Sequence, residues 1–160
     1  MRHLISLILF GLIGIQIATL STIVHPISAK VQHINQLQIA AMKAGLGYPG
    51  EKILNAIKMA SLQTGLSQEL LLSLMHSESS FKKNAISAKN YKGLLQIPQS
   101  VFYEDANTLI GARILLEKLI ITKGDYKYAI VLYKGWPLNH PEGQRQAVKV
   151  LNLTRRLKGI

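Results

Sequence analysis

The spacing of apolar residues along the chain predicts a mainly helical protein. Apolar side chains recur near the 3.6-residue period of an α-helix between residues 34 and 63, interrupted at residues 45–50 by a Gly- and Pro-containing cluster that ends a helix. Residues 82–103 have no clear period and are expected to be irregular. The helical period returns in four further segments: 67–81, 106–122, 126–133 and 141–157. Because no alternating runs typical of strands occur, we expect a mainly α fold.

Two residues mark where predicted helices begin. Ser67 is a natural N-cap for the third helix, and Glu69 lies in the first turn, where the helix dipole favours a negative charge. Pro141 suits the first position of the last helix, because its missing N–H would have no partner there.

The N-terminal segment, residues 1–29, differs from the rest of the chain. Its strongly apolar core, Leu4–Ile15, has twelve residues, which is the length of a signal-peptide core rather than the ~20 residues that span a bilayer. Small residues ending at Ala29 suit cleavage by a signal peptidase. We therefore expect a signal peptide, with an uncleaved membrane anchor as the alternative. Either one exports residues 30–160 to the periplasm or cell envelope, as one domain.

Composition excludes several kinds of chemistry. The 160-residue chain contains no cysteine, so it has no disulfide, no thiolate metal site and no lipid-modified N-terminal cysteine. Its five histidines show no paired ligand spacing. We expect neither a metal nor another cofactor.

The net charge of +11 favours a polyanionic partner such as nucleic acid, an anionic lipid surface or a bacterial cell wall. Nearly all of this charge lies in residues 30–160, where lysine outnumbers arginine. Arginine is the residue suited to bidentate recognition of bases and phosphates, so its scarcity in an exported domain argues against nucleic acid. Attraction to an anionic cell wall, through the carboxylates of its stem peptides, is the interpretation we favour.

The third predicted helix carries the most informative residue, Glu78. Leu70, Leu71, Leu74 and Met75 form its apolar stripe, and the same i+3 and i+4 spacing continues to Glu78. Burial and the negative end of the helix dipole both disfavour a charged carboxylate at this position. A carboxyl group that keeps its proton is suited to general-acid catalysis. The alternative is that Glu78 faces solvent and pairs with Lys82 at i+4.

A series of short motifs surrounds Glu78. The Glu78-Ser79 pair is followed by Phe, Ala and Ser at fixed offsets, then by the stretch GLLQIP at residues 93–98. An Asn-x-x-x-Gly pair follows at residues 107–111, and an Ala-x-x-x-Tyr segment ends at Tyr133. In order and spacing this series resembles the soluble lytic transglycosylase (SLT) family, which is related to goose-type lysozymes. The resemblance covers about residues 62–157.

The resemblance implies a lysozyme-like helical domain that binds peptidoglycan. It also implies a lyase that cleaves the β-1,4 bond between N-acetylmuramic acid and N-acetylglucosamine without water, giving 1,6-anhydromuramyl products. Glu78 takes the position of the family's catalytic acid and base. No second acid lies within the matched motifs, whereas an ordinary two-carboxylate glycosidase needs one at a defined distance.

The resemblance also assigns residues around the substrate. Ser79 matches the Ser after the acid, whose hydroxyl bonds Glu78 or substrate; a Ser at a helix end also commonly bonds backbone. Gln96 matches a sugar-contacting Gln, and Tyr133 a Tyr near the acid and the N-acetyl group, with a loop polar residue and a core aromatic as the simpler interpretations. Gly93 is expected to provide backbone geometry, and Leu95, in place of the usual Met, an apolar wall.

The chain departs from the family pattern in several places. Lys83 stands where Pro is common, Asn90-Tyr91 replaces a Gly-Ala pair, and the segment between residues 98 and 107 is short. Lys134 follows Tyr133 in place of the usual Asn. Three alternatives therefore stay open: a lytic transglycosylase, a hydrolytic muramidase on the same fold, and a non-catalytic wall-binding or assembly module, for example within an envelope-spanning secretion or conjugation apparatus.

Overall fold

The computed structural model describes residues 36–159. The chain divides into two units, Met1–Gln36 and Leu37–Ile160, and the features below lie in the second. The predicted signal or anchor segment, residues 1–29, lies outside the described residues. None of the helices in the described part is both long and apolar enough to cross a membrane.

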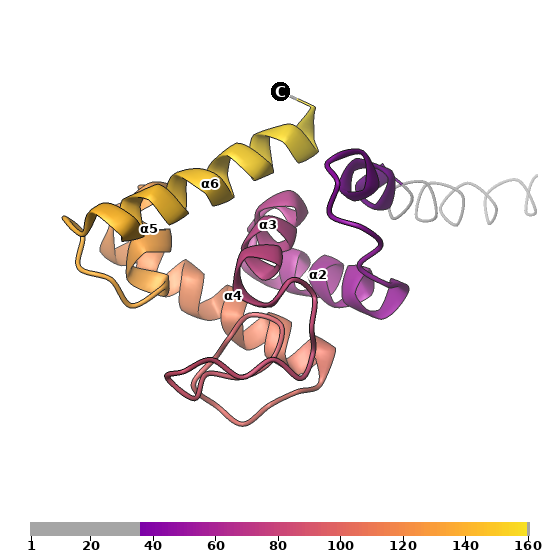
Figure 1. Cartoon of the computed structure of the whole chain (residues 1–160), viewed down its shortest axis with the longest axis horizontal. Coiled ribbons are helices and arrows are strands. Elements are labelled where there is room, and N and C mark those ends of the chain that lie inside the picture. Colours follow the sequence, from indigo (N-terminus) through magenta and orange to yellow (C-terminus); the bar gives the residue numbers. More distant parts are fainter. Residues whose placement is uncertain (1–35, 160) are drawn as a thin grey trace, which may run out of the picture. The chain divides into compact units, whose positions relative to one another are not determined.

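The described residues form a helical domain, as the sequence predicted (Figure 1). Residues 36–43 are helical and are followed by five further helices. These are α2 Glu51–Thr64, α3 Gln68–Ser79, α4 Glu104–Ile121, α5 Tyr126–Tyr133 and α6 Pro141–Lys158. Residues 80–103 are irregular, as expected, with isolated bridges at Ile86–Lys92 and Lys92–Ile97 as the extended pairing in this part of the chain.

Local signals fix the helix ends. The Ser67 hydroxyl accepts a 3.3 Å hydrogen bond from the N–H of Leu70 at the start of α3, which confirms it as the N-cap. Pro141 opens α6 as predicted. Gly65 ends α2 with a left-handed backbone (φ 72°), a conformation that glycine adopts without steric cost.

Helix α3 is more deeply buried than its sequence pattern predicted. The expected stripe of Leu70, Leu71, Leu74 and Met75 is buried, but the side chains between them are buried as well. Helices α2 and α6 both pack against α3, while α4 packs against α2 and α5 and α5 also packs against α6. Because neighbours surround α3, the prediction of a single buried stripe was too narrow.

Candidate active site

Glu78 lies in the last turn of α3, where the chain leaves the core. The first two residues after the helix, Ser80 and Phe81, both have left-handed backbones (φ 49° and 65°), so the chain turns sharply just beyond the helix. The Glu78 side chain is 14% exposed. It is therefore held at the end of a buried helix with access to solvent on one side.

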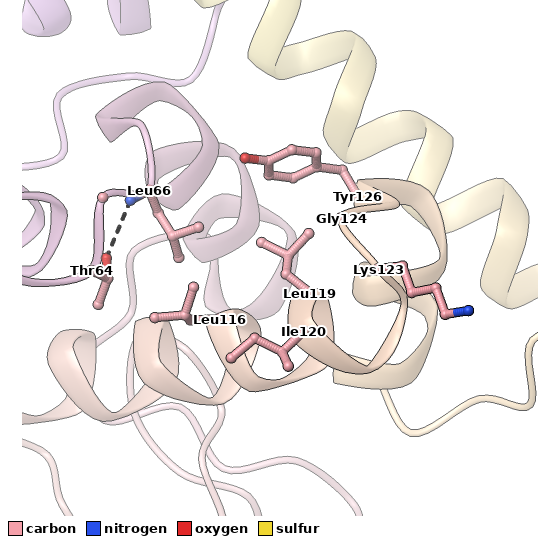
Figure 2. A pocket seen from close by; sticks show the side chains of 9 residues that line it. Thr64, Leu66, Leu116, Leu119, Ile120, Lys123, Gly124 and Tyr126 are labelled. Carbon is pink, nitrogen blue, oxygen red and sulfur yellow. Dashed lines mark hydrogen bonds between the residues drawn. The ribbon is translucent and has the colours of Figure 1, made fainter.

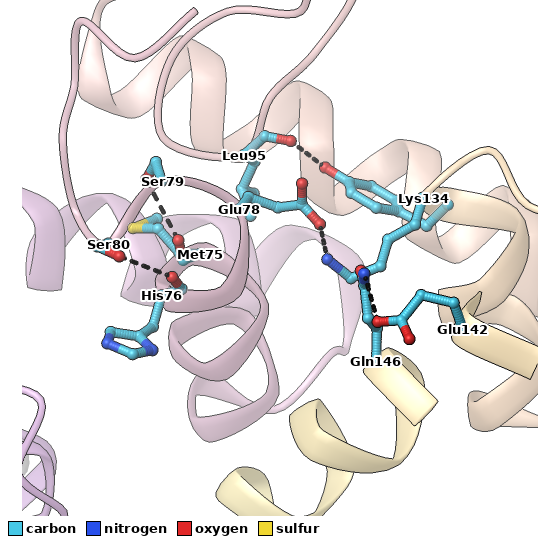
Figure 3. Close-up of polar contacts among 10 residues, drawn as sticks. Met75, His76, Glu78, Ser79, Ser80, Leu95, Lys134, Glu142 and Gln146 are labelled. Atoms are coloured by element: carbon cyan, nitrogen blue, oxygen red, sulfur yellow. Dashed lines mark hydrogen bonds and ion pairs between the residues drawn. The ribbon is translucent and has the colours of Figure 1, made fainter. Parts of the chain in front are cut away.

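The Glu78 carboxylate forms an ion pair with Lys134, the residue that follows α5 (Figure 3). Lys134 Nζ donates to Glu78 Oε1 at 2.6 Å, and the Lys134 side chain is 7% exposed. The partner is thus not Lys82, the i+4 residue that sequence spacing offered. The adjacent ammonium gives the carboxylate a counter-ion, an interaction that the sequence argument from burial and the helix dipole did not include.

Tyr133 lies beside this ion pair. Its hydroxyl donates a 2.6 Å hydrogen bond to the carbonyl oxygen of Leu95. Burial raises the pKa of the Tyr133 phenol well above its usual value, and the negative charge of Glu78 raises it further. Tyr133 therefore remains a protonated hydroxyl at neutral pH.

Gln96 points its amide group into its own loop. Its Nε2 donates to the carbonyl oxygens of Gly93 (2.8 Å) and Ala85 (3.1 Å), and the residue is 8% exposed. Both amide hydrogens are therefore used within the loop. The amide oxygen is the group that remains to accept a hydrogen bond from a ligand.

The side chains of Ser79 and Leu95 point into the protein and not toward a substrate. The Ser79 hydroxyl donates to the Met75 carbonyl oxygen at 3.2 Å (Figure 3). This is the bond to backbone that we gave as the alternative to a bond with Glu78 or substrate. The Leu95 side chain is fully buried, so it packs beneath the site and does not form an exposed apolar wall. Ser79 thus bonds within the last turn of α3, and the backbone of Leu95 binds the Tyr133 hydroxyl.

Asn107, buried at the start of α4, fastens the loop that carries Gln96. Its Oδ1 accepts from the Leu95 N–H at 2.8 Å, and its Nδ2 donates to the carbonyl oxygens of Val101 (2.7 Å) and Lys92 (2.9 Å). Gly93 has φ 81°, and a Cβ there would lie 2.1 Å from Asn107 Nδ2. Position 93 thus favours glycine for two reasons: its left-handed backbone, as expected, and the close approach of the Asn107 side chain.

A Cβ at Gly111, one turn further along α4, would lie 2.6 Å from Leu95 Cβ and 3.0 Å from the Tyr133 hydroxyl. The contacts of Asn107 and Gly111, one turn apart on α4, therefore account for the spacing of the Asn-x-x-x-Gly motif. Asn107 holds the backbone of the loop, and Gly111 gives Leu95 and Tyr133 room to meet.

Glu78 opens into a cavity of about 250 Å³ between the irregular segment and the end of α5. Its lining combines charged, aromatic and small polar side chains: Glu78, Ser87, Ala88, Lys89, Tyr91, Gln96, Tyr133, Lys134 and Trp136. Glu78 is the only carboxylate among these lining residues. The arrangement can offer a proton-transferring carboxyl group to a ligand that also meets aromatic and cationic groups.

Another cavity, of about 400 Å³, lies between the α2–α3 turn and the α4–α5 turn (Figure 2). It is lined mainly by apolar groups, including Leu66, Leu116 and Leu119, and Lys123 is the charged residue in its lining. It contains no carboxylate, so it does not compete with the Glu78 cavity as a candidate for acid–base chemistry. No group of three His, Cys, Asp or Glu suited to a metal ion occurs within residues 36–159.

The family model described as Transglycosylase SLT domain matches residues 55–130. This match confirms the resemblance that the motifs indicated: residues 55–130 match the domain of a family of lytic transglycosylases acting on peptidoglycan, consistent with an SLT family, lysozyme-like protein. No curated protein matches the chain. Glu78, Gly93 and Gln96 lie inside the matched segment, whereas Tyr133 and Lys134 lie just beyond it.

Sequence reasoning missed three residues of the cavity. Lys134 entered only as a departure from the usual Asn, and its pairing with Glu78 depends on how α5 approaches α3. Lys89 and Trp136 lie in segments without periodicity. The one available signal was composition, since Trp136 is the only tryptophan in the chain and follows Tyr133 closely.

Proposed function

We propose that this domain is a lytic transglycosylase of the cell envelope. It cleaves the β-1,4 bond between N-acetylmuramic acid and N-acetylglucosamine in peptidoglycan and leaves 1,6-anhydromuramyl ends. The observation that carries the proposal is the position of Glu78: a single carboxyl group in a cavity formed by the family's motif segments.

Glu78 performs both proton transfers. In its protonated form it donates a proton to the glycosidic oxygen as the bond between that oxygen and muramyl C1 breaks. The resulting carboxylate accepts the proton of the muramyl 6-hydroxyl as O6 bonds to C1. The cycle thus ends with Glu78 protonated, and no water is consumed.

The surrounding carboxylates favour this one-carboxylate route. Glu104 pairs with Lys83 at 3.6 Å, and Glu142 pairs with Arg145 at 2.6 Å. Neither lines the Glu78 cavity. A two-carboxylate glycosidase instead places its second group about 5–9.5 Å from the first, across the scissile bond.

Other site residues support the substrate. The amide oxygen of Gln96 accepts a hydrogen bond from a sugar, while its two inward bonds keep the side chain fixed. Tyr133 presents its ring to the N-acetyl group, with its hydroxyl anchored on Leu95. Ser79 contributes by holding the last turn of α3. We further propose that residues 1–29 export the domain.

The Lys134–Glu78 ion pair favours one alternative, a non-catalytic wall-binding module, because a general acid must first lose this partner. Incubation of the exported chain with purified cell-wall sacculi separates the two. A lytic transglycosylase should release soluble muropeptides as the wild-type protein and none as Glu78→Gln, and Glu78→Gln should sediment with sacculi at least as well as the wild type. Equal effects of the two proteins on the wall would support the binding module.

A further inference from the structure

The cavity that contains Glu78 also contains two lysines from separate segments. Lys134 follows α5, and Lys89 lies in the irregular segment 80–103. Lys89 Nζ would lie 3.7 Å from a Cβ placed on Gly135, the neighbour of Lys134. Both lysines therefore line the Glu78 cavity, and Lys89 Nζ lies near the backbone that follows Lys134.

Trp136 lies beside Lys89 in this cavity. Lys89 Nζ lies 5.6 Å from the centroid of the Trp136 ring, within the range of a cation–π interaction. The ring itself is fixed, because it stacks on His140 with centroids 4.0 Å apart and packs closely on Gly143, where a Cβ would lie 2.7 Å from Trp136 Cβ. The exposed side chain of Lys89 thus has a fixed aromatic ring beside its ammonium group.

The charge of the cavity changes when Glu78 takes up a proton. With Glu78 ionised, Lys134 has its counter-ion at 2.6 Å. With Glu78 protonated, as the proposed reaction requires, neither Lys134 nor Lys89 has a carboxylate among the cavity residues. The Lys134 ammonium is largely buried, and such a group is unfavourable without a counter-ion, so an anion supplied by the substrate would stabilise the reactive form. Lys89 is exposed and adds a second positive charge beside it.

Muramic acid can supply that anion, because its lactyl ether ends in a carboxyl group close to the sugar ring. This carboxylate is free in a glycan without stem peptides and is converted to an uncharged amide when a peptide is attached. We infer that Lys134 and Lys89 form a carboxylate-binding subsite, and that the domain acts on glycan whose muramyl residue carries a free carboxylate beside the scissile bond. This inference rests on the proposed function.

Binding measurements test the subsite independently of cleavage. Glu78→Gln mimics the protonated acid and leaves Lys134 without its counter-ion, and Glu78→Gln/Lys134→Gln removes the cation as well. Three oligosaccharides of equal length serve as ligands: peptide-free N-acetylglucosamine–N-acetylmuramic acid, the same glycan with stem peptides, and chitooligosaccharide, which has no carboxylate. Glu117→Gln and Lys123→Gln change the same charges at exposed positions and serve as controls.

We expect Glu78→Gln to bind the peptide-free glycan about tenfold more tightly than the wild type does. Raising the salt from about 50 to 300 mM should reduce this gain. The double variant should lose it, and chitooligosaccharide should bind all variants alike. A gain confined to the stem-bearing glycan would support a carboxylate subsite but assign its ligand to the peptide. No gain with either glycan, or an equal gain with chitooligosaccharide, would overturn the inference.

These outcomes are separable from the proposed function. Cleavage of sacculi by the wild type without any gain in Glu78→Gln would retain the transglycosylase and reject the subsite. A gain in binding without cleavage would retain the carboxylate subsite and reject the activity.

Discussion

Lys134 and Glu78 form an ion pair of 2.6 Å between the residue that follows α5 and the last turn of α3. Both side chains are largely buried, with exposed fractions of 7% for Lys134 and 14% for Glu78. In this ion pair Lys134 binds the same carboxyl group to which we assign both proton transfers. On the proposed mechanism, the ion pair must therefore open before Glu78 can donate a proton.

Replacing Lys134 by Gln should separate turnover from affinity. Without the ammonium there is no ion pair to open before Glu78 transfers its proton, so we expect kcat on peptide-free glycan to rise about fivefold. KM should rise as well, because a partner for the substrate carboxylate is lost. Steady-state kinetics on defined oligosaccharides provide the measurement, with Lys123→Gln as a matched control at an exposed position. A fall in kcat would contradict the assigned role.

Tyr133→Phe should destabilise the domain and change its response to alkaline pH. The variant leaves the buried Leu95 carbonyl oxygen without its donor, at a cost of about 1–2 kcal/mol in the free energy of unfolding at pH 7. Because the folded state raises the pKa of Tyr133 above its unfolded value, its contribution is complete below about pH 10 and falls as the pH rises further.

Chemical denaturation at neutral pH and above pH 10 therefore tests this prediction. The difference in stability between wild type and Tyr133→Phe should shrink as the pH rises. Tyr103→Phe, which removes an exposed phenol, should show no such change. A difference that stays constant across the pH range would contradict the role given to the Tyr133 proton.

Asn107→Ala should be among the most destabilising single substitutions. It removes a hydrogen bond from three backbone groups: the N–H of Leu95 and the carbonyl oxygens of Val101 and Lys92. Of these, the Lys92 carbonyl oxygen keeps its bond from the N–H of Ile97. We expect a loss of about 3 kcal/mol in the free energy of unfolding. Asn84→Ala alters an exposed residue of the same irregular segment and should change stability little. Similar losses in the two variants would contradict the fastening role of Asn107.

Gly93→Ala tests the close approach between the loop and α4. Both Gly93 and Gly124 have left-handed backbones (φ 81° and 87°), but a Cβ at Gly124 meets no atom within 4 Å. Gly124→Ala should therefore cost only the backbone strain, about 1 kcal/mol, whereas Gly93→Ala should cost about 3 kcal/mol. Equal losses in thermal or denaturant unfolding would show that Asn107 moves aside freely.

Local features of the sequence were sufficient to predict the helices. Ser67 and Pro141 mark their helix starts through hydrogen-bonding requirements that neighbouring residues alone determine. The position of Glu78 at the end of α3 follows from the same local periodicity. Family motifs then identified the loop containing Gly93 and Gln96.

Tertiary contacts were beyond such reasoning. The pairing of Glu78 with Lys134 requires the approach of two helices far apart in sequence, and spacing alone offered only Lys82. The burial of Leu95 depends in the same way on its packing against α4, through the space left at Gly111. These contacts determine the charge and shape of the cavity, which the sequence does not encode locally.

The central claim is that Glu78 cleaves the glycan without water. It is tested most directly by mass spectrometry of the muropeptides released from purified sacculi by the wild-type protein and by Glu78→Gln. We expect 1,6-anhydromuramyl ends from the wild type and none above background from Glu78→Gln. Reducing muramyl ends from the wild type, or release by Glu78→Gln at a rate close to that of the wild type, would contradict it.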